Sequence, residues 1–444
     1  MKRLWLTLFE EYFVHENSRA YPCWIGIRYR FRGGLKREAL QAALEQTVRR
    51  HPLLSSVVRR EWHGRLYWER IPGWKPVLDW REDAHGTEGM EWHFSDLFHE
   101  PGFRLVAAGV SGGTEVLLQT HHALLDGAGV FAVFHEVLLN YARGQGQAVE
   151  LPELKPELFP DRNRFGLTLA DKIKMIPSQL VGLLVCAQLQ SRKAASLVPH
   201  QLCPDNAPAP AGWPAVASRS FSADDYNAIR EAAKKRGVGT NDFFIRDFFA
   251  AIDTWRTAQG IGSPSDWIRM GVPMSLRRPA DRCLSAANVI SVVTIDRPAT
   301  SLGNRARLLR RAREDMEWIK TKKLSHTFLV MLGIYRGLAG GIRRFTAREE
   351  CQSTVMLTNL GQLFSRSPLQ NARRLIEVPG AVLEDITVIA PYRPGTCAAL
   401  SVSIYAGRLL ADINYDPRFL TRAQADGLLE AFRAQLRISV ESEG

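Results

Sequence analysis

The heptapeptide His-His-Ala-Leu-Leu-Asp-Gly at residues 121–127 guides the interpretation of the whole sequence. It follows residues 115–120, which predict a β-strand. It precedes a run to Tyr141 whose apolar residues recur at helical spacing. We therefore place the motif at a strand-to-helix junction, where its side chains are held rigidly and face a cleft. Chance produces such a pattern in a chain of this size at a frequency of roughly a per cent or less.

The residue types of this motif suit acyl transfer. An acceptor hydroxyl or amine loses a proton as it attacks a thioester, and a neutral imidazole with a pKa near ~6.5 is well matched to accept it. We predict that His122 is the general base, that Asp126 fixes the turn and helix start, and that Gly127 lets the backbone pass closely. No GxSxG serine elbow and no paired cysteine nucleophile is visible, so we expect direct attack without a covalent acyl-enzyme.

The other histidines have structural interpretations. We expect His121 to pack in the core with its ring hydrogen-bonded to a carbonyl. His135 is expected to be structural, and His51 ends a helix. A zinc site built from His121, His122 and His135 would lack a fourth ligand and the correct spacing, so we predict no metal and no bound cofactor.

Composition is that of an ordinary globular protein, with 45% hydrophobic and 23% charged residues among 444. The formal net charge of +12 favours acidic partners. No nucleic-acid-binding signature accompanies the basic residues, so nucleic acid is disfavoured. Most of them suit a solvated helix face, although the helices around Arg310 and Arg343 are candidates to receive a phosphorylated or acidic donor. The basic residues concentrate at Arg305, Arg307, Arg310, Arg311, Arg313, Lys320, Lys322, Lys323, Arg336, Arg343, Arg344 and Arg348.

The six cysteines are widely scattered, which indicates thiols in a reducing compartment. The N-terminus lacks the apolar region of a signal peptide. The most apolar stretch, residues 176–189, is short for a bilayer span and is interrupted by Pro177. We therefore expect a cytoplasmic protein.

Prolines and glycines divide the chain into an N-terminal half (residues 1–150), a crossover linker (151–215) and a C-terminal half (216–444). The linker holds an amphipathic stretch at 167–194, which is alternatively a lid or a membrane-touching helix because lysines and arginines flank it. Each half mixes strands and helices without a strict βαβ repeat, which predicts an α/β sandwich-like fold. We expect helices at 35–50, 222–237, 242–257 and 422–438, and strands at 24–31, 267–272, 289–295, 353–357, 386–389, 398–405 and 409–415.

The motif at residues 121–127 resembles the HHxxxDG signature shared by several acyltransferases: non-ribosomal peptide condensation domains, polyketide-associated acyltransferases, alcohol O-acetyltransferases and wax ester synthases. Residues 31–54 are similar to the opening strand, helix and RHPxLR turn of these proteins, and residues 271–277 to their vPvsLR strand. Residues 358–361 resemble their (S/T)NLG stretch. The likeness departs at Ser55, which replaces an arginine, and at Ala287-Asn288, which replaces Gly-Asn; the absence of DFGWG disfavours the plant-type branch.

The resemblance implies two chloramphenicol-acetyltransferase-like halves that form a V, a pseudo-dimer with a tunnel between its halves. It implies that His122 is the base and that Asp126 pairs with Arg277 to order the motif loop. Thr358 or Asn359 would then lie near the developing oxyanion.

We therefore expect a stand-alone acyltransferase that moves an acyl group from coenzyme A or an acyl carrier protein to a hydroxyl or amine. A non-catalytic module that binds an acidic carrier protein is the alternative from another class. Two further alternatives retain the acyl-transfer chemistry. One forms an amide, and the other is wax-ester-type synthesis on a membrane. Acyl length, acceptor, donor type and oligomeric state depend on packing that the sequence leaves open.

Overall fold

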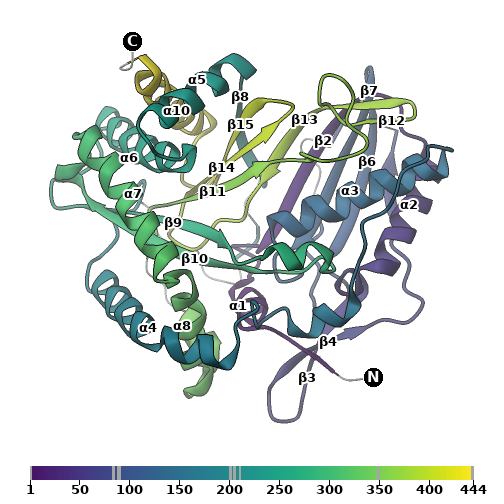
Figure 1. Cartoon of the computed structure of the whole chain (residues 1–444), viewed down its shortest axis with the longest axis horizontal. Helices are drawn as coiled ribbons and strands as arrows, with labels where there is room; N and C mark the ends of the chain where they lie inside the picture. The colour runs from purple at the N-terminus through teal and green to yellow at the C-terminus, as the bar shows by residue number, and fades with distance from the viewer. Residues whose placement is uncertain are drawn as a thin grey trace. The chain divides into compact units, whose positions relative to one another are not determined.

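The computed structural model describes residues 3–82, 86–87, 92–199, 203, 207–209, 212–347 and 351–441. The chain forms two compact units, each assembled from three segments (Figure 1). The first unit comprises Met1–Gly166, Ser275–Ile290 and Gln362–Ala390, and the second comprises Leu167–Met274, Ser291–Gly361 and Pro391–Gly444. These boundaries differ from the predicted ranges 1–150, 151–215 and 216–444. The reason is that segments from the C-terminal half complete the first unit.

The first unit is built on a six-stranded sheet with the order β12-β13-β2-β7-β6-β5. Its strand β2 (Trp24–Gly33) pairs antiparallel with β7 (Gly113–His121) and with β13 (Ala381–Ile389). A second, three-stranded sheet has the order β1-β4-β3. The remaining strands are β1 (Leu4–Trp5), β3 (Ser56–Arg60), β4 (Leu66–Arg70), β5 (Leu78–Arg81), β6 (Phe103–Val110) and β12 (Glu377–Val378).

The helices of this unit are α1 (Leu8–Glu16), α2 (Arg37–Arg50) and α3 (Gly127–Gly144). Apolar side chains hold α3 on the sheet: the Tyr29 ring of β2 stacks on Phe134 of α3 with centroids 3.6 Å apart, and both rings are buried. The predicted turn after β2 depends on Gly33, whose φ is +88°. A Cβ there would lie 2.3 Å from the Gly380 carbonyl oxygen, so only glycine fits.

The second unit has its own six-stranded sheet, with the order β10-β9-β11-β14-β15-β8. Rings from two helices pack together beside it, with the Phe248 and Phe432 centroids 5.8 Å apart. Its strands are β8 (Ala215–Phe221), β9 (Trp267–Ser275), β10 (Ile290–Pro298), β11 (Val355–Gln362), β14 (Ala398–Tyr405) and β15 (Arg408–Tyr415). Its helices are α4 (Leu169–Gln190), α5 (Ala223–Lys235), α6 (Thr240–Ala258), α7 (Arg305–Thr321), α8 (Thr327–Gly337), α9 (Gly341–Thr346) and α10 (Arg422–Glu441).

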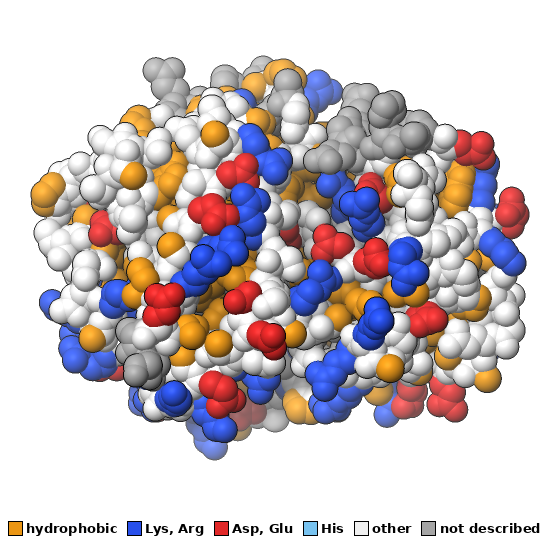
Figure 2. Space-filling view, turned by 90° about the horizontal axis from the view of Figure 1, so that it is seen from above, with side chains coloured by type: hydrophobic (Ala, Val, Ile, Leu, Met, Phe, Trp, Pro, Cys, Tyr) orange, Lys and Arg blue, Asp and Glu red, His pale blue; other side chains and the backbone are white. Residues whose placement is uncertain are grey.

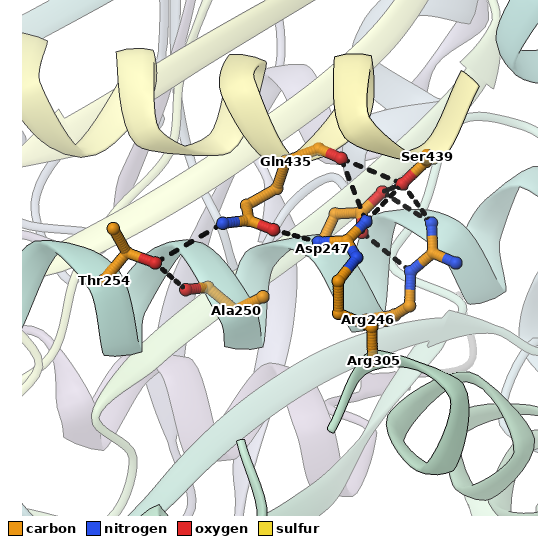
Figure 3. A network of polar contacts seen from close by, with 7 residues as sticks. All are labelled: Arg246, Asp247, Ala250, Thr254, Arg305, Gln435 and Ser439. Carbon is orange, nitrogen blue, oxygen red and sulfur yellow. Dashed lines mark hydrogen bonds and ion pairs between the residues drawn. The ribbon is translucent and has the colours of Figure 1, made fainter. Parts of the chain in front are cut away.

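A buried polar network joins three helices of the second unit (Figure 3). The Asp247 carboxylate of α6 accepts hydrogen bonds from Arg246 Nε at 2.7 Å and from Arg305 Nη2 of α7 at 3.0 Å. Ser439 of α10 donates its hydroxyl to the same carboxylate at 2.7 Å. Arg305 also contacts Gln435, so this arginine of the predicted basic helix serves the interior of the fold.

The predicted α/β class is confirmed, and a strand or helix is present in each of the predicted ranges. Helices α1 and α8 and strands β1, β3, β4, β5, β6, β8 and β12 were not predicted. The predicted linker contains a regular helix of 22 residues, α4, which continues through Pro177. None of the six cysteines, all within the described part of the chain, forms a disulfide.

Candidate active site

Backbone pairing fixes the two histidines at the end of β7. His121 lies opposite Trp24 in the β2–β7 ladder, and its N–H donates to the Gly102 carbonyl at 2.8 Å. The N–H of His122 donates to the Cys23 carbonyl at 2.8 Å. The sheet thus holds both backbones before the chain turns towards α3, as the strand-to-helix position predicts.

Asp126 begins α3 as its N-cap. Its Oδ1 accepts the Gly129 N–H at 2.7 Å, which satisfies one of the free amides at the helix start. Its Oδ2 accepts the Val289 N–H at 2.8 Å, so the same carboxylate holds a segment distant in sequence. The side chain is fully buried, and Gly127 is the first residue of the helix.

Arg277 pairs with Asp126, as the resemblance implies. Its Nη2 lies 2.8 Å from Oδ1 and 3.0 Å from Oδ2, and it donates to the Ala287 carbonyl at 2.7 Å. One nitrogen therefore makes all three of these contacts. Backbone amides hydrogen-bond to the carboxylate, and a backbone carbonyl hydrogen-bonds to the guanidinium, so both charges have polar partners. This arrangement suits a carboxylate that holds a loop in place.

The His122 ring has a defined tautomer. Its Nδ1 lies 3.1 Å from the Leu125 carbonyl oxygen, which can only accept, so Nδ1 carries the hydrogen. Nε2 is then the unprotonated nitrogen, with its lone pair directed away from the Leu125 bond. The neutral ring thus has one nitrogen able to take a proton.

Burial lowers the pKa of His122 to about 4, while hydrogen bonds to backbone carbonyls and the charge of Asp126 act in the opposite direction. The ring is consequently neutral at neutral pH. A base must be unprotonated before it acts, and this environment secures that state, while a pKa of about 4 makes the ring a weaker base than the ~6.5 expected from the sequence.

Helix α1 supplies an aromatic partner for this ring. Phe13 stacks on His122 with centroids 4.1 Å apart and planes inclined by 11°. Helix α1 is anchored by its capping box at Thr7 and Glu10, and Arg162 binds Glu10 at 2.6 Å. Phe13 was missed from the sequence, because the segment at 8–16 lies far from the motif and has no signature of its own.

His121 faces the interior. It is buried, its Nδ1 accepts the Ala123 N–H at 3.1 Å, and its ring meets the edge of Trp24. Burial, followed by the neighbouring His122, lowers its pKa to about 3. Its ring thus packs in the core, although its Nδ1 accepts from an amide rather than donating to a carbonyl.

Two further residues support the motif loop and were not predicted as site residues. Asn288 donates its Nδ2 hydrogen to the His122 carbonyl at 2.6 Å. A Cβ on Gly129 would lie 3.1 Å from the Ala287 oxygen, so the backbone approaches closely there. The sequence signal for Asn288 was the Ala287-Asn288 pair, which retains the asparagine of the resembling proteins.

The remaining predicted residues have local partners. His51 lies 3.2 Å from Glu136 through Nε2 and accepts the Ala286 N–H, and His135 lies 2.7 Å from Ser367. Burial lowers the pKa of His135 to about 4. Both rings therefore have structural contacts.

Thr358 and Asn359 lie on β11 of the second unit. Asn359 donates to Asn241 at 3.1 Å and accepts the Gly361 N–H at 2.9 Å. Their place near an oxyanion stays a prediction.

The basic helices differ in how their charges are compensated. On α7, Arg310 and Arg311 lie within 3.8 Å and 3.5 Å of Glu314. On α9, Arg343 and Arg344 are exposed. Arg348 lies outside the described residues.

No sequence profile of a known family and no curated protein matches the chain. Solved structures do. The first condensation domain of the CDA synthetase is 15% identical, with a TM-score of 0.72 over 99% of this chain and 96% of that one. The starter condensation domain of rhizomide synthetase RzmA, a mutant in complex with C8-CoA and Leu-SNAC, is 14% identical, with a TM-score of 0.67 over 99% and 94%.

The epimerization domain of tyrocidine synthetase TycB3 is 12% identical, with a TM-score of 0.65 over 99% of this chain and 97% of that one. Identities this low establish architecture alone. The resemblance expected from the motif is confirmed at that level: the chain has the condensation-domain fold.

Proposed function

We propose that this protein is an acyltransferase that moves an acyl group from a coenzyme A or acyl-carrier-protein thioester to a hydroxyl or amine. The observation that carries the proposal is the 3.1 Å contact between His122 Nδ1 and the Leu125 carbonyl oxygen, which assigns the hydrogen to Nδ1 and leaves Nε2 as the base. An enzyme of this type needs a neutral imidazole at neutral pH, and burial supplies one.

The reaction proceeds through His122 alone among the motif residues. The acceptor attacks the thioester carbonyl carbon as its proton passes to His122 Nε2. The tetrahedral oxyanion then collapses and the C–S bond breaks. The proton on Nε2 goes to the leaving thiolate, which returns the imidazole to its neutral form. No bond forms between enzyme and acyl group, since no serine or cysteine nucleophile accompanies the motif.

Asp126 acts as a positioning residue in this scheme. Both of its oxygens are engaged by Arg277 and by the amides of Gly129 and Val289, and the ring's Nδ1–H is given to a carbonyl. The carboxylate therefore holds the loop that carries His122. It does not relay the proton.

The comparisons support a thioester donor. The rhizomide synthetase domain was solved with C8-CoA, and the CDA synthetase domain has also been solved with a substrate analogue. A non-catalytic module that binds an acidic carrier protein would have no need of a histidine held in one tautomer. That distinction makes the base the point to test.

The test is mass spectrometry of products formed from a panel of acyl-CoA and acyl-carrier-protein donors with mixed alcohols and amines. We expect His122→Ala to lower turnover by ~10²–10⁴-fold, the usual effect of losing a general base. His99→Ala, which removes an exposed surface ring, is the matched control and should keep full turnover. Equal product from His122→Ala and the wild type would rule out this base. Carrier binding without product from either protein would favour the binding module.

A further inference from the structure

Helix α4 turns an apolar stripe to the solvent. Its residues Leu169, Ile173, Ile176, Leu180 and Leu184 are each between 52% and 75% exposed. At 3.6 residues per turn they fall within about 80° of arc, so they form one continuous face. A surface helix of a globular protein normally turns such a stripe inwards, and here the stripe is left uncovered.

The opposite side of α4 is fixed to the protein. Gly182 lies so close to α8 that a Cβ would be 2.2 Å from Thr327 Oγ1. Thr327 donates to Gln179 at 3.0 Å, and Gln179 donates to the Lys323 carbonyl at 3.2 Å. By length and composition α4 is apolar enough to cross a membrane, but crossing would break these contacts. The packing therefore favours a helix that lies on a surface.

The neighbouring helix extends the apolar area. Helix α8 lies beside α4 (Figure 1) and exposes Val330 and Ile334, and the residue that follows the helix, Leu338, is exposed as well. We call these three residues and the five of the α4 stripe the α4–α8 surface. Both helices thus carry uncovered apolar side chains, which are more numerous than the single exposed residues of an ordinary protein exterior.

The charged side chains around the α4–α8 surface are mostly basic. One acidic residue, Asp171, is present in residues 167–190 and 322–347. On the face of the molecule drawn in Figure 2, by contrast, Lys and Arg side chains lie among Asp and Glu side chains. Relative to the stripe's centre, Lys172 lies roughly 80° to one side and Lys174 roughly 120° to the other. The exposed basic residues of these two ranges are Lys172, Lys174, Lys322, Lys323, Arg336, Arg343 and Arg344.

We propose that the α4–α8 surface binds an anionic lipid membrane, with α4 lying in the plane of the interface. The apolar stripe enters the boundary between headgroups and acyl chains, and the flanking lysines extend to the lipid phosphates. A second copy of the chain fits less well, because pairing these surfaces would bring two sets of lysines and arginines, which carry like charge, close together. The inference does not depend on the proposed acyl transfer.

The test is flotation of the full chain with vesicles of phosphatidylcholine alone or mixed equally with phosphatidylglycerol. We expect the wild type to float with the mixed vesicles, less with neutral ones, and less again at high salt. Ile176→Asp with Leu180→Asp places charge on the stripe and should lower binding by about tenfold or more. Lys172→Gln with Lys174→Gln should weaken binding to the mixed vesicles only.

The matched control is Val77→Asp, which makes the same change at another exposed position and should bind as the wild type does. Thermal melting checks that each variant is folded. Absence of flotation, or flotation unchanged by Ile176→Asp with Leu180→Asp, overturns the proposal. So does a dimer in analytical ultracentrifugation that this double variant dissociates, or capture of an acidic carrier protein in place of vesicles.

Discussion

Two fully buried carboxylates, Asp126 in the first unit and Asp247 in the second, differ in what holds them. In the second unit Asp247 is bound by Arg246, Arg305 and Ser439, all side chains of helices (Figure 3). In the first unit Asp126 is bound by one arginine and by two backbone amides, those of Gly129 and Val289. The contacts of Asp247 hold helices together. The contacts of Asp126 hold loops in place.

The difference matters because a loop can bind one ring nitrogen of a histidine and leave the other nitrogen able to take a proton. The loop after β7 carries His122, whose Nδ1 is bound and whose Nε2 is available. The network around Asp247 contains no group with a comparable free lone pair on a neutral base. Chemistry and stability are thus expected to respond to different carboxylates.

The largest effect on stability is expected from Asp247→Ala. It leaves Arg246 buried without its partner, and breaking a buried ion pair from one side costs about 3–5 kcal/mol. Urea unfolding measures the loss. Asp253→Ala on the same helix, where the side chain is partly exposed, should cost about 1 kcal/mol or less. A similar loss in both variants would mean that the network contributes nothing special to the fold.

Compared with Asp247→Ala, Asp126→Asn is expected to lower the stability less and the turnover more. An amide has one carbonyl oxygen, so it cannot accept from both Gly129 and Val289, and it loses its charge towards Arg277. We expect about 2–3 kcal/mol of destabilisation and a turnover at least about tenfold lower in the folded protein.

Arg277→Lys is the companion variant to Asp126→Asn. Since Nη2 alone makes the three contacts to Asp126 and Ala287, a lysine nitrogen can replace part of them, and the loss should be near 1 kcal/mol. Unfolding and turnover are measured together. If Asp126→Asn and Asp247→Ala lowered the turnover of folded protein equally, the proposed division between the two carboxylates would be wrong.

The sequence predicted the parts of the site that depend on neighbours in the chain. The strand, the turn and the N-cap at Asp126 follow from local pattern, and the partner Arg277 came from the resemblance. Phe13 could not be predicted, because its contact with His122 depends on where α1 packs and no spacing encodes that. The exchange of β12 and β13 into the first sheet was missed for the same reason: pairing of distant strands leaves no periodic signal in the chain.

The histidines with lowered pKa values predict that the stability of the first unit is more sensitive to acid than that of the second. Burial lowers the pKa of His121 to about 3 and of His122 and His135 to about 4. All three belong to the first unit, whereas the described part of the second contains one histidine, His326, whose pKa burial also lowers. The first unit therefore has more neutral rings to lose to protonation.

In the unfolded chain each histidine has a pKa near ~6.5, so between that value and about 4 the unfolded state binds more protons. The stability contributed by the neutral rings is complete above pH ~6.5 and is lost as the pH falls. Between pH 7 and pH 6 we expect opening of the first unit to become easier by about 1–2 kcal/mol, and opening of the second by less. Hydrogen exchange, corrected for its intrinsic pH dependence, measures both units in one sample. His135→Gln should make this pH response of the first unit smaller. His99→Gln, which changes an exposed ring, should leave the response unchanged. An equal loss of stability in the two units would contradict the assignment of the neutral buried rings to the first unit.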